Sequence, residues 1–120
     1  MVDSGTYDRM LDLRPLNVRT ALPDSRCALV SGRDISSVAR ARNAIVMAAN
    51  IRNPLSALGI LRAARRADSF VILELAKSEG KYTGVTYQNL PQTAQAYSSD
   101  LGDGVVYALH MDHYAVKSRA

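Results

Sequence analysis

The fold is decided by the stretch Val105-Val106-Tyr107-Ala108-Leu109-His110-Met111-Asp112-His113, an apolar run that ends in two histidines and a carboxylate. Residues 105–109 carry no charge, which predicts a strand buried on both faces rather than wetted on one. Because active sites of parallel sheets and barrels collect at the carboxyl ends of strands, His110, Asp112 and His113 form a candidate site. The alternative interpretation makes His110 a core histidine with satisfied hydrogen bonds and Asp112 the cap of a turn.

The overall composition is that of an ordinary globular protein. Of the 120 residues, 48% are hydrophobic and 22% are charged, which argues against disorder and predicts a single domain. No apolar run approaches the roughly 20 residues of a membrane span, and residues 1–4 do not begin a signal peptide. The one cysteine, Cys27, excludes an internal disulfide framework and fits a reducing compartment. We therefore expect a soluble cytoplasmic protein.

The net charge of +4 raises the question of nucleic-acid binding. The lysines and arginines are spread along the chain without a basic block, and no aromatic residues interleave with them as a stacking platform requires. A mildly basic surface that attracts phosphorylated substrates explains the charge equally well. We expect neither a nucleic-acid nor a membrane partner.

Residues 1–43 are expected to form a helical or irregular N-terminal arm. Pro15 and Pro23 mark turns, and residues 27–30 are an apolar run that suits either a strand or a buried helical piece. Asp34 is placed to cap the start of a short helix. This segment is interpreted as an arm with a lid helix rather than a separate domain.

Residues 44–120 alternate between strands and helices. The patterns predict strands at residues 44–49, 70–75 and 105–109, the first of them buried, and helices at 54–66 and 91–101. Asn53 is a strong N-cap, and Pro54 is favoured at the first helical position. Connections of this length between strands require parallel pairing, so we expect an α/β fold, with a further helix beginning near residues 117–120.

Polar groups follow each of the three predicted strands. They are Asn50, the segment Lys77-Ser78-Glu79, and residues 110–113. In one parallel sheet these groups meet at the same rim, which favours a functional site there. A glycine-rich dinucleotide fingerprint, a phosphate-loop motif and a nucleophile-elbow serine are all absent from the sequence.

These segments resemble the opening of a class II, metal-dependent fructose-bisphosphate aldolase. The resemblance covers about residues 40–117 and rests on Ala48-Ala49-Asn50, the helix that begins at Asn53-Pro54, the strand at 71–75, and above all on 108–113. It implies a TIM (β/α)8 barrel of which residues 44–120 supply strands 1–3. It also implies a divalent metal, usually Zn²⁺, that polarises the ketone of a dihydroxyacetone-phosphate unit.

The resemblance also implies roles for particular residues. His113 resembles the first of three zinc-binding histidines, and Asp112 resembles the acid/base that handles the hydroxyl proton of the aldehyde partner. Asn50 resembles the substrate-contacting asparagine after strand 1. Ser78 lies where the family has a substrate-contacting serine, although the local sequence Ala-Lys-Ser-Glu departs from the commoner glycine-rich version. His110 matches a histidine near the metal that is not assigned as a ligand.

The chemistry makes independent sense of these residue types. Retro-aldol cleavage leaves an enediolate, whose charge a divalent metal stabilises as a Lewis acid, and imidazole is a good zinc ligand. A carboxylate beside the metal is well placed for proton transfer. Because neighbouring residues of a strand point to opposite sides, Asp112 and His113 can both reach a substrate only where the chain turns out of the strand.

Chain length sets this sequence apart from a whole barrel, which takes about 250 residues. Three predicted strands and two histidines are too few for the barrel and for its zinc site, so we expect a fragment that is inactive alone and a homo-oligomer when full length. The expected reaction is reversible cleavage of fructose 1,6-bisphosphate to dihydroxyacetone phosphate and glyceraldehyde 3-phosphate. The alternatives are a related aldolase acting on tagatose bisphosphate and a small non-catalytic α/β module that binds a phosphorylated ligand.

Overall fold

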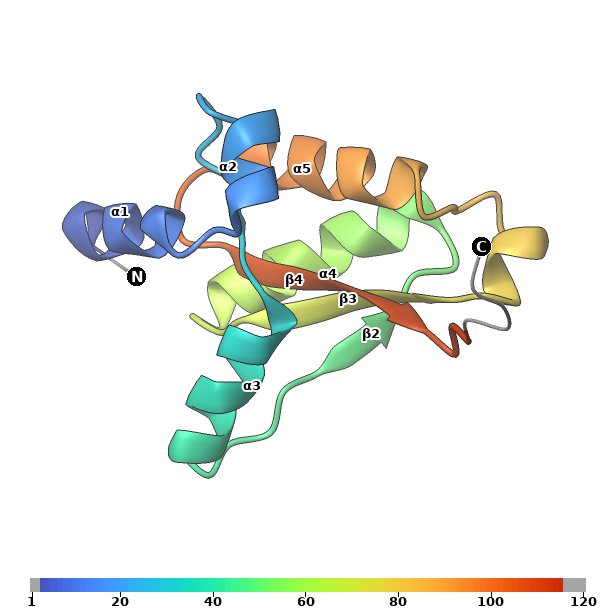
Figure 1. Cartoon of the computed structure of the whole chain (residues 1–120), viewed down its shortest axis with the longest axis horizontal. Helices are drawn as coiled ribbons and strands as arrows, with labels where there is room; N and C mark the ends of the chain where they lie inside the picture. The colour runs from blue at the N-terminus through green and yellow to red at the C-terminus, as the bar shows by residue number, and fades with distance from the viewer. Residues whose placement is uncertain (1–2, 116–120) are drawn as a thin grey trace.

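The computed structural model describes residues 3–115 and shows one sheet of four parallel strands with helices on both faces (Figure 1). The elements in chain order are α1 Ser4–Asp12, α2 Leu16–Ala21, β1 Ala28–Leu29, α3 Gly32–Ala41, β2 Ala48–Asn50, α4 Pro54–Arg66, β3 Val71–Ala76, the 3-10 helix η1 Glu79–Lys81, α5 Asn89–Leu101 and β4 Val106–Asp112. The order across the sheet is β1-β4-β3-β2. The predicted α/β class is confirmed, and the β2-α4-β3-α5-β4 succession is that of part of a barrel.

The strand that decides the fold, β4, lies inside the sheet. It pairs with β3 from Val71↔Tyr107 to Ala76↔Asp112 and with β1 on its other side. Tyr107 and Ala108 are completely buried, which confirms the strand predicted from the uncharged run. The strand continues to Asp112, beyond the predicted end, because β3 pairs with it over that whole length.

Each face of the sheet has its own hydrophobic cluster, because successive side chains of a strand point to opposite faces. On one face α4 and α5 cover the larger cluster, in which Leu61, Leu73 and Tyr107 are completely buried. On the other face α3 packs a smaller cluster with Ile35 and Ala108 (Figure 1). This second cluster covers only the first part of β4, so the carboxyl half of that face carries polar side chains.

Helix α4 begins as the sequence predicts. The Asn53 side chain accepts a hydrogen bond from the Leu55 N–H at 2.8 Å, and Pro54 occupies the first helical position. One face of the helix is buried through Ala57, Leu61 and Ala64, while Arg62 and Arg66 are exposed on the other. The helix therefore packs on the sheet by its apolar stripe alone.

The prediction of a buried strand at residues 44–49 is wrong. Only Ala48–Asn50 is strand, Ile45 is 98% exposed and Met47 is 61% exposed. The physical reason is position: β2 is an outermost strand that pairs with β3 on one side only. Among the described residues nothing packs over Ile45, so an apolar run that suits a central strand here lies at a sheet edge.

The N-terminal segment also differs from expectation. Residues 27–30, left open between strand and helix, include the strand β1, which pairs with Val106 and Tyr107 and makes the sheet four-stranded rather than three-stranded. Asp34 is not the N-cap of α3. The Ser31 hydroxyl accepts the hydrogen bond from the Arg33 N–H instead, so the helix begins earlier and Asp34 lies in its first turn.

Helix α5 begins before Pro91, at Asn89. The Asn89 side chain accepts a hydrogen bond from the Thr86 N–H at 2.7 Å, and the Thr86 hydroxyl accepts one from the Asn89 N–H at 3.1 Å. This reciprocal pair satisfies backbone donors at the helix start, so proline is not needed to open it. The helix expected near residues 117–120 lies outside the described residues.

Candidate active site

The carboxyl ends of β2, β3 and β4 meet at one rim of the sheet. Asn50 pairs in register with Glu74, and Glu74 pairs in register with His110. One step further along, Ala76 pairs with Asp112. Because residues two apart on a strand share a face, Glu74, His110 and Asp112 lie on the same face, beyond the cluster packed by α3. The predicted meeting of the three strand ends is confirmed.

Glu74, His110 and Asp112 form a compact group of metal-binding side chains. One donor atom from each lies within 4.8 Å of the others. His110 Nδ1 is 2.8 Å from Glu74 Oε2, and the Glu74 side chain is only 13% exposed. The His110 side chain is 55% exposed, so the interpretation of His110 as a core histidine is wrong. It stands at the rim, held from one side by a carboxylate.

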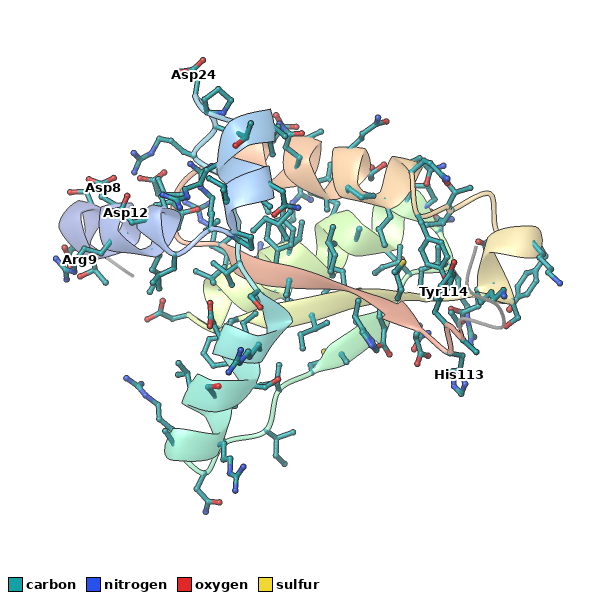
Figure 2. The ribbon with its side chains drawn as sticks, viewed as in Figure 1. Asp8, Arg9, Asp12, Asp24, His113 and Tyr114 are labelled. Atoms are coloured by element: carbon teal, nitrogen blue, oxygen red, sulfur yellow. The ribbon has the colours of Figure 1, made fainter. Side chains whose placement is uncertain are left out.

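The chain turns out of the strand at the point that the chemistry requires. Strand β4 ends at Asp112, and His113 has φ of +53°, in the left-handed region that few non-glycine residues adopt. His113 Nε2 consequently lies 3.7 Å from Asp112 Oδ2, although neighbouring side chains in a strand would point apart. Figure 2 shows His113 just beyond the end of β4, where its side chain is 83% exposed.

Ser78 and His113 line the same hollow, which has a volume of about 490 Å³. Lys77 and Lys81 also line it, together with Ala115. Lys77 Nζ lies 5.3 Å from the centre of the Tyr114 ring, within the range of a cation–π contact. Two lysines and a hydroxyl around one hollow suit an anionic ligand such as a phosphate.

Glu79, which the sequence places at the rim only as part of the polar segment Lys77-Ser78-Glu79, is a site residue in its own right. It is 3% exposed, and its carboxylate accepts hydrogen bonds from Arg52 Nε at 2.7 Å, from the Ala76 N–H at 2.9 Å and from Asn50 Nδ2 at 2.9 Å. These contacts, led by the Arg52 hydrogen bond, lower the pKa of Glu79 to about 2. The available signal was an acidic residue in the loop after β3 together with an arginine in the loop after the neighbouring strand β2.

Glu74 was not predicted as a site residue from the sequence. Its charge interrupts the apolar strand β3, and a charged residue inside a predicted buried strand is a signal, because burial of a charge is costly without a partner. The partner is His110, which is far away in sequence and becomes adjacent only when β3 and β4 pair in this register.

A comparison with protein-family models assigns the chain to a family. The model of the fructose-bisphosphate aldolase class-II family matches residues 30–119. This chain belongs to the class II fructose-bisphosphate aldolase family. The match includes the whole of β2, β3 and β4 and every predicted site residue, whereas β1 lies just before it. A search of curated proteins gave no match.

Class II aldolases generally depend on a divalent metal and act on sugar phosphates, and the residues present suit both. Imidazole nitrogen and carboxylate oxygen are good ligands for Zn²⁺ and related ions, and Glu74, His110, Asp112 and His113 supply them at one rim. The hollow beside His113 supplies positive charge. Within residues 3–115, no helix has the length and apolar character needed to cross a membrane.

Proposed function

We propose that this chain carries part of an active site for the metal-dependent, reversible cleavage of fructose 1,6-bisphosphate to dihydroxyacetone phosphate and glyceraldehyde 3-phosphate. The observation that carries the proposal is the turn at His113, which brings an imidazole and the Asp112 carboxylate to the same rim. Family membership supports the reaction type. Residues 44–120 are the barrel portion, residues 1–43 an N-terminal arm with a lid helix, and the working protein a cytoplasmic homo-oligomer.

The side chains divide the chemistry between them. Asp112 is the acid/base that exchanges a proton with the hydroxyl group of the aldehyde partner, as a positioned carboxylate does in general acid–base catalysis. His113 holds the metal, Zn²⁺ or another divalent ion, which when bound supplies positive charge at the ketone oxygen. His110 stands beside it, and Glu74 holds the His110 ring by a 2.8 Å contact to Nδ1.

Substrate contacts come from the ends of the other two strands. Asn50 presents a side-chain amide at the end of β2, and Ser78 lines the hollow with Lys77 and Lys81. The lysine pair attracts a phosphate group, which places the sugar chain toward Asp112. Positioning of this kind converts binding energy into correct alignment of the reacting groups.

Zinc-linked binding of dihydroxyacetone phosphate tests the proposal. We expect Zn²⁺ to tighten binding about tenfold, an effect worth about 1.4 kcal/mol. His113→Ala should abolish this zinc effect, while Asp100→Asn, an exposed charge change on α5, should preserve it. Binding that ignores both Zn²⁺ and His113 would contradict the aldolase site and favour the non-catalytic module, which the basic hollow alone would explain.

Turnover gives a second test. The chain has two histidines, whereas the family resemblance implies three zinc-binding ones, so we expect no sustained cleavage of fructose 1,6-bisphosphate by the 120-residue chain. Clear zinc-dependent release of glyceraldehyde 3-phosphate by the purified chain would contradict this expectation. Parallel assays with tagatose bisphosphate would then show which sugar phosphate is preferred.

A further inference from the structure

A buried carboxylate lies directly beneath the rim that carries the candidate active site. Glu79 is the first residue of η1, in the loop after β3, and joins the ends of two strands by accepting from the Ala76 N–H and from Asn50 Nδ2. Arg52 completes its hydrogen bonding. A buried charge is tolerated only when its hydrogen bonds are made, and those of Glu79 are made.

The hydrogen bond between Glu79 and Asn50 fixes which end of the Asn50 amide faces the carboxylate. An ionised carboxylate only accepts hydrogen bonds, so the amide must present Nδ2 to it and turn Oδ1 away. Among the described residues, Oδ1 of Asn50 has no hydrogen-bond donor, and Asn50 is exposed. The carbonyl oxygen is therefore an open acceptor at the rim.

The position of this acceptor relates it to the candidate chemistry. Asn50, Glu74 and His110 form one row across β2, β3 and β4, and Asp112 lies one step further along the same face. An asparagine without a fixed partner can present either end of its amide. One held by a carboxylate presents only its oxygen, which selects a ligand group that donates a hydrogen bond, such as a hydroxyl.

We propose that Glu79 is a positioning residue that holds the Asn50 carbonyl oxygen toward the site, where it accepts a hydrogen bond from a hydroxyl group of the sugar phosphate. The identity of the ligand rests on the proposed function, but the orientation of the amide does not. A purely structural role, in which Glu79 only ties β2 to β3, would leave the amide orientation without effect on binding.

The variant Glu79→Leu separates the two roles, with Glu79→Gln as its matched control. Glu79 Oε2 accepts from both the Ala76 N–H and Asn50 Nδ2, while Oε1 accepts from Arg52 Nε, so a glutamine carbonyl in the place of Oε2 still holds the Asn50 amide. A leucine offers no acceptor, so the Asn50 amide loses its fixed orientation. We expect the Asn50 side-chain NH₂ resonances in ¹⁵N NMR spectra to move further in Glu79→Leu than in Glu79→Gln and to stay in place in Asp100→Asn. Circular dichroism checks that all variants remain folded.

The affinity for the ligand supplies the second readout. We expect Glu79→Leu to bind dihydroxyacetone phosphate about tenfold more weakly than the native chain, the loss of roughly one hydrogen bond. Glu79→Gln keeps the contact to Asn50 and loses only the charge opposite Arg52, so it should stay within about threefold of the native affinity.

The outcomes distinguish this inference from the proposed function. Asn50 resonances that do not move in Glu79→Leu overturn the inference, whatever the ligand does. Resonances that move while Glu79→Leu and Glu79→Gln bind the ligand with equal affinity also overturn it and leave Glu79 as a structural tie between β2 and β3. If the native chain does not bind dihydroxyacetone phosphate at all, the proposed function fails, and the amide resonances alone decide the orientation of Asn50.

Discussion

Replacement of Glu79 by glutamine should also destabilise the fold in a pH-dependent way. The pKa of Glu79 falls from an ordinary 4.5 to about 2 in the folded chain. At about 1.4 kcal/mol for each tenfold change in proton affinity, this corresponds to about 3 kcal/mol. Arg52 contributes the leading hydrogen bond, and its side chain is 69% exposed, so solvent screening reduces the figure to about 2 kcal/mol.

The sign follows from linkage between protonation and folding. Because the folded pKa lies below the unfolded value, the stabilisation is fully present above pH 4.5 and is lost as the pH falls toward 2. Urea unfolding followed by circular dichroism at several pH values from 6 to 2.5 measures it. We expect Glu79→Gln to be less stable than the native chain by about 2 kcal/mol at pH 6, with a difference that shrinks as the pH falls.

The control is Asp100→Asn, since Asp100 is exposed on α5 and has no part in the rim. Its stability should follow the native curve at every pH. Equal stability of Glu79→Gln and the native chain at pH 6, or a constant difference down to pH 2.5, would refute the account of Glu79 as an ionised, buried link between β2 and β3.

Three further substitutions test other parts of the fold by urea unfolding. Leu73→Ala opens a cavity in the completely buried centre of β3 and should cost about 2–5 kcal/mol; a loss below 1 kcal/mol would mean that the core collapses around it. Asn53→Ala removes the cap of α4 and should cost about 1 kcal/mol, whereas Asn53→Asp should cost little; equal losses would show that the cap is irrelevant. Ile45→Lys should change stability by less than about 0.5 kcal/mol, and a larger loss would show that Ile45 is covered in solution.

Much of the sheet could be predicted because its central strands are buried, and a buried strand appears in the sequence as a short apolar run. The uncharged run before His110 predicts a buried strand, and Asn53-Pro54 predicts a helix start, and both are confirmed. The exposure of Ile45 could not be predicted, because the strand order that leaves β2 at the edge is not visible in an apolar run. The pairing of β1 with β4 joins segments about 80 residues apart and has no local signature.

The candidate site was predictable as far as chain order determines it. Parallel strands bring their carboxyl ends together, so the sequence alone assigns Asn50, Ser78 and Asp112 to one rim. The Glu74–His110 and Glu79–Asn50 contacts depend on strand register and on a buried loop, and neither follows from spacing along the chain. The turn at His113 was expected only because Asp112 and His113 must both reach a substrate. No residue pattern in the sequence predicts its left-handed conformation.

Zinc binding by the native chain and by His113→Ala, measured by titration calorimetry, tests the central claim most directly. Asp100→Asn is the matched control for a surface change away from the rim. The account predicts that the native chain and Asp100→Asn bind Zn²⁺ alike and that His113→Ala binds at least about tenfold more weakly. Zinc affinity that is the same in His113→Ala and the native chain would contradict the assignment of this rim as the metal site of a class II aldolase.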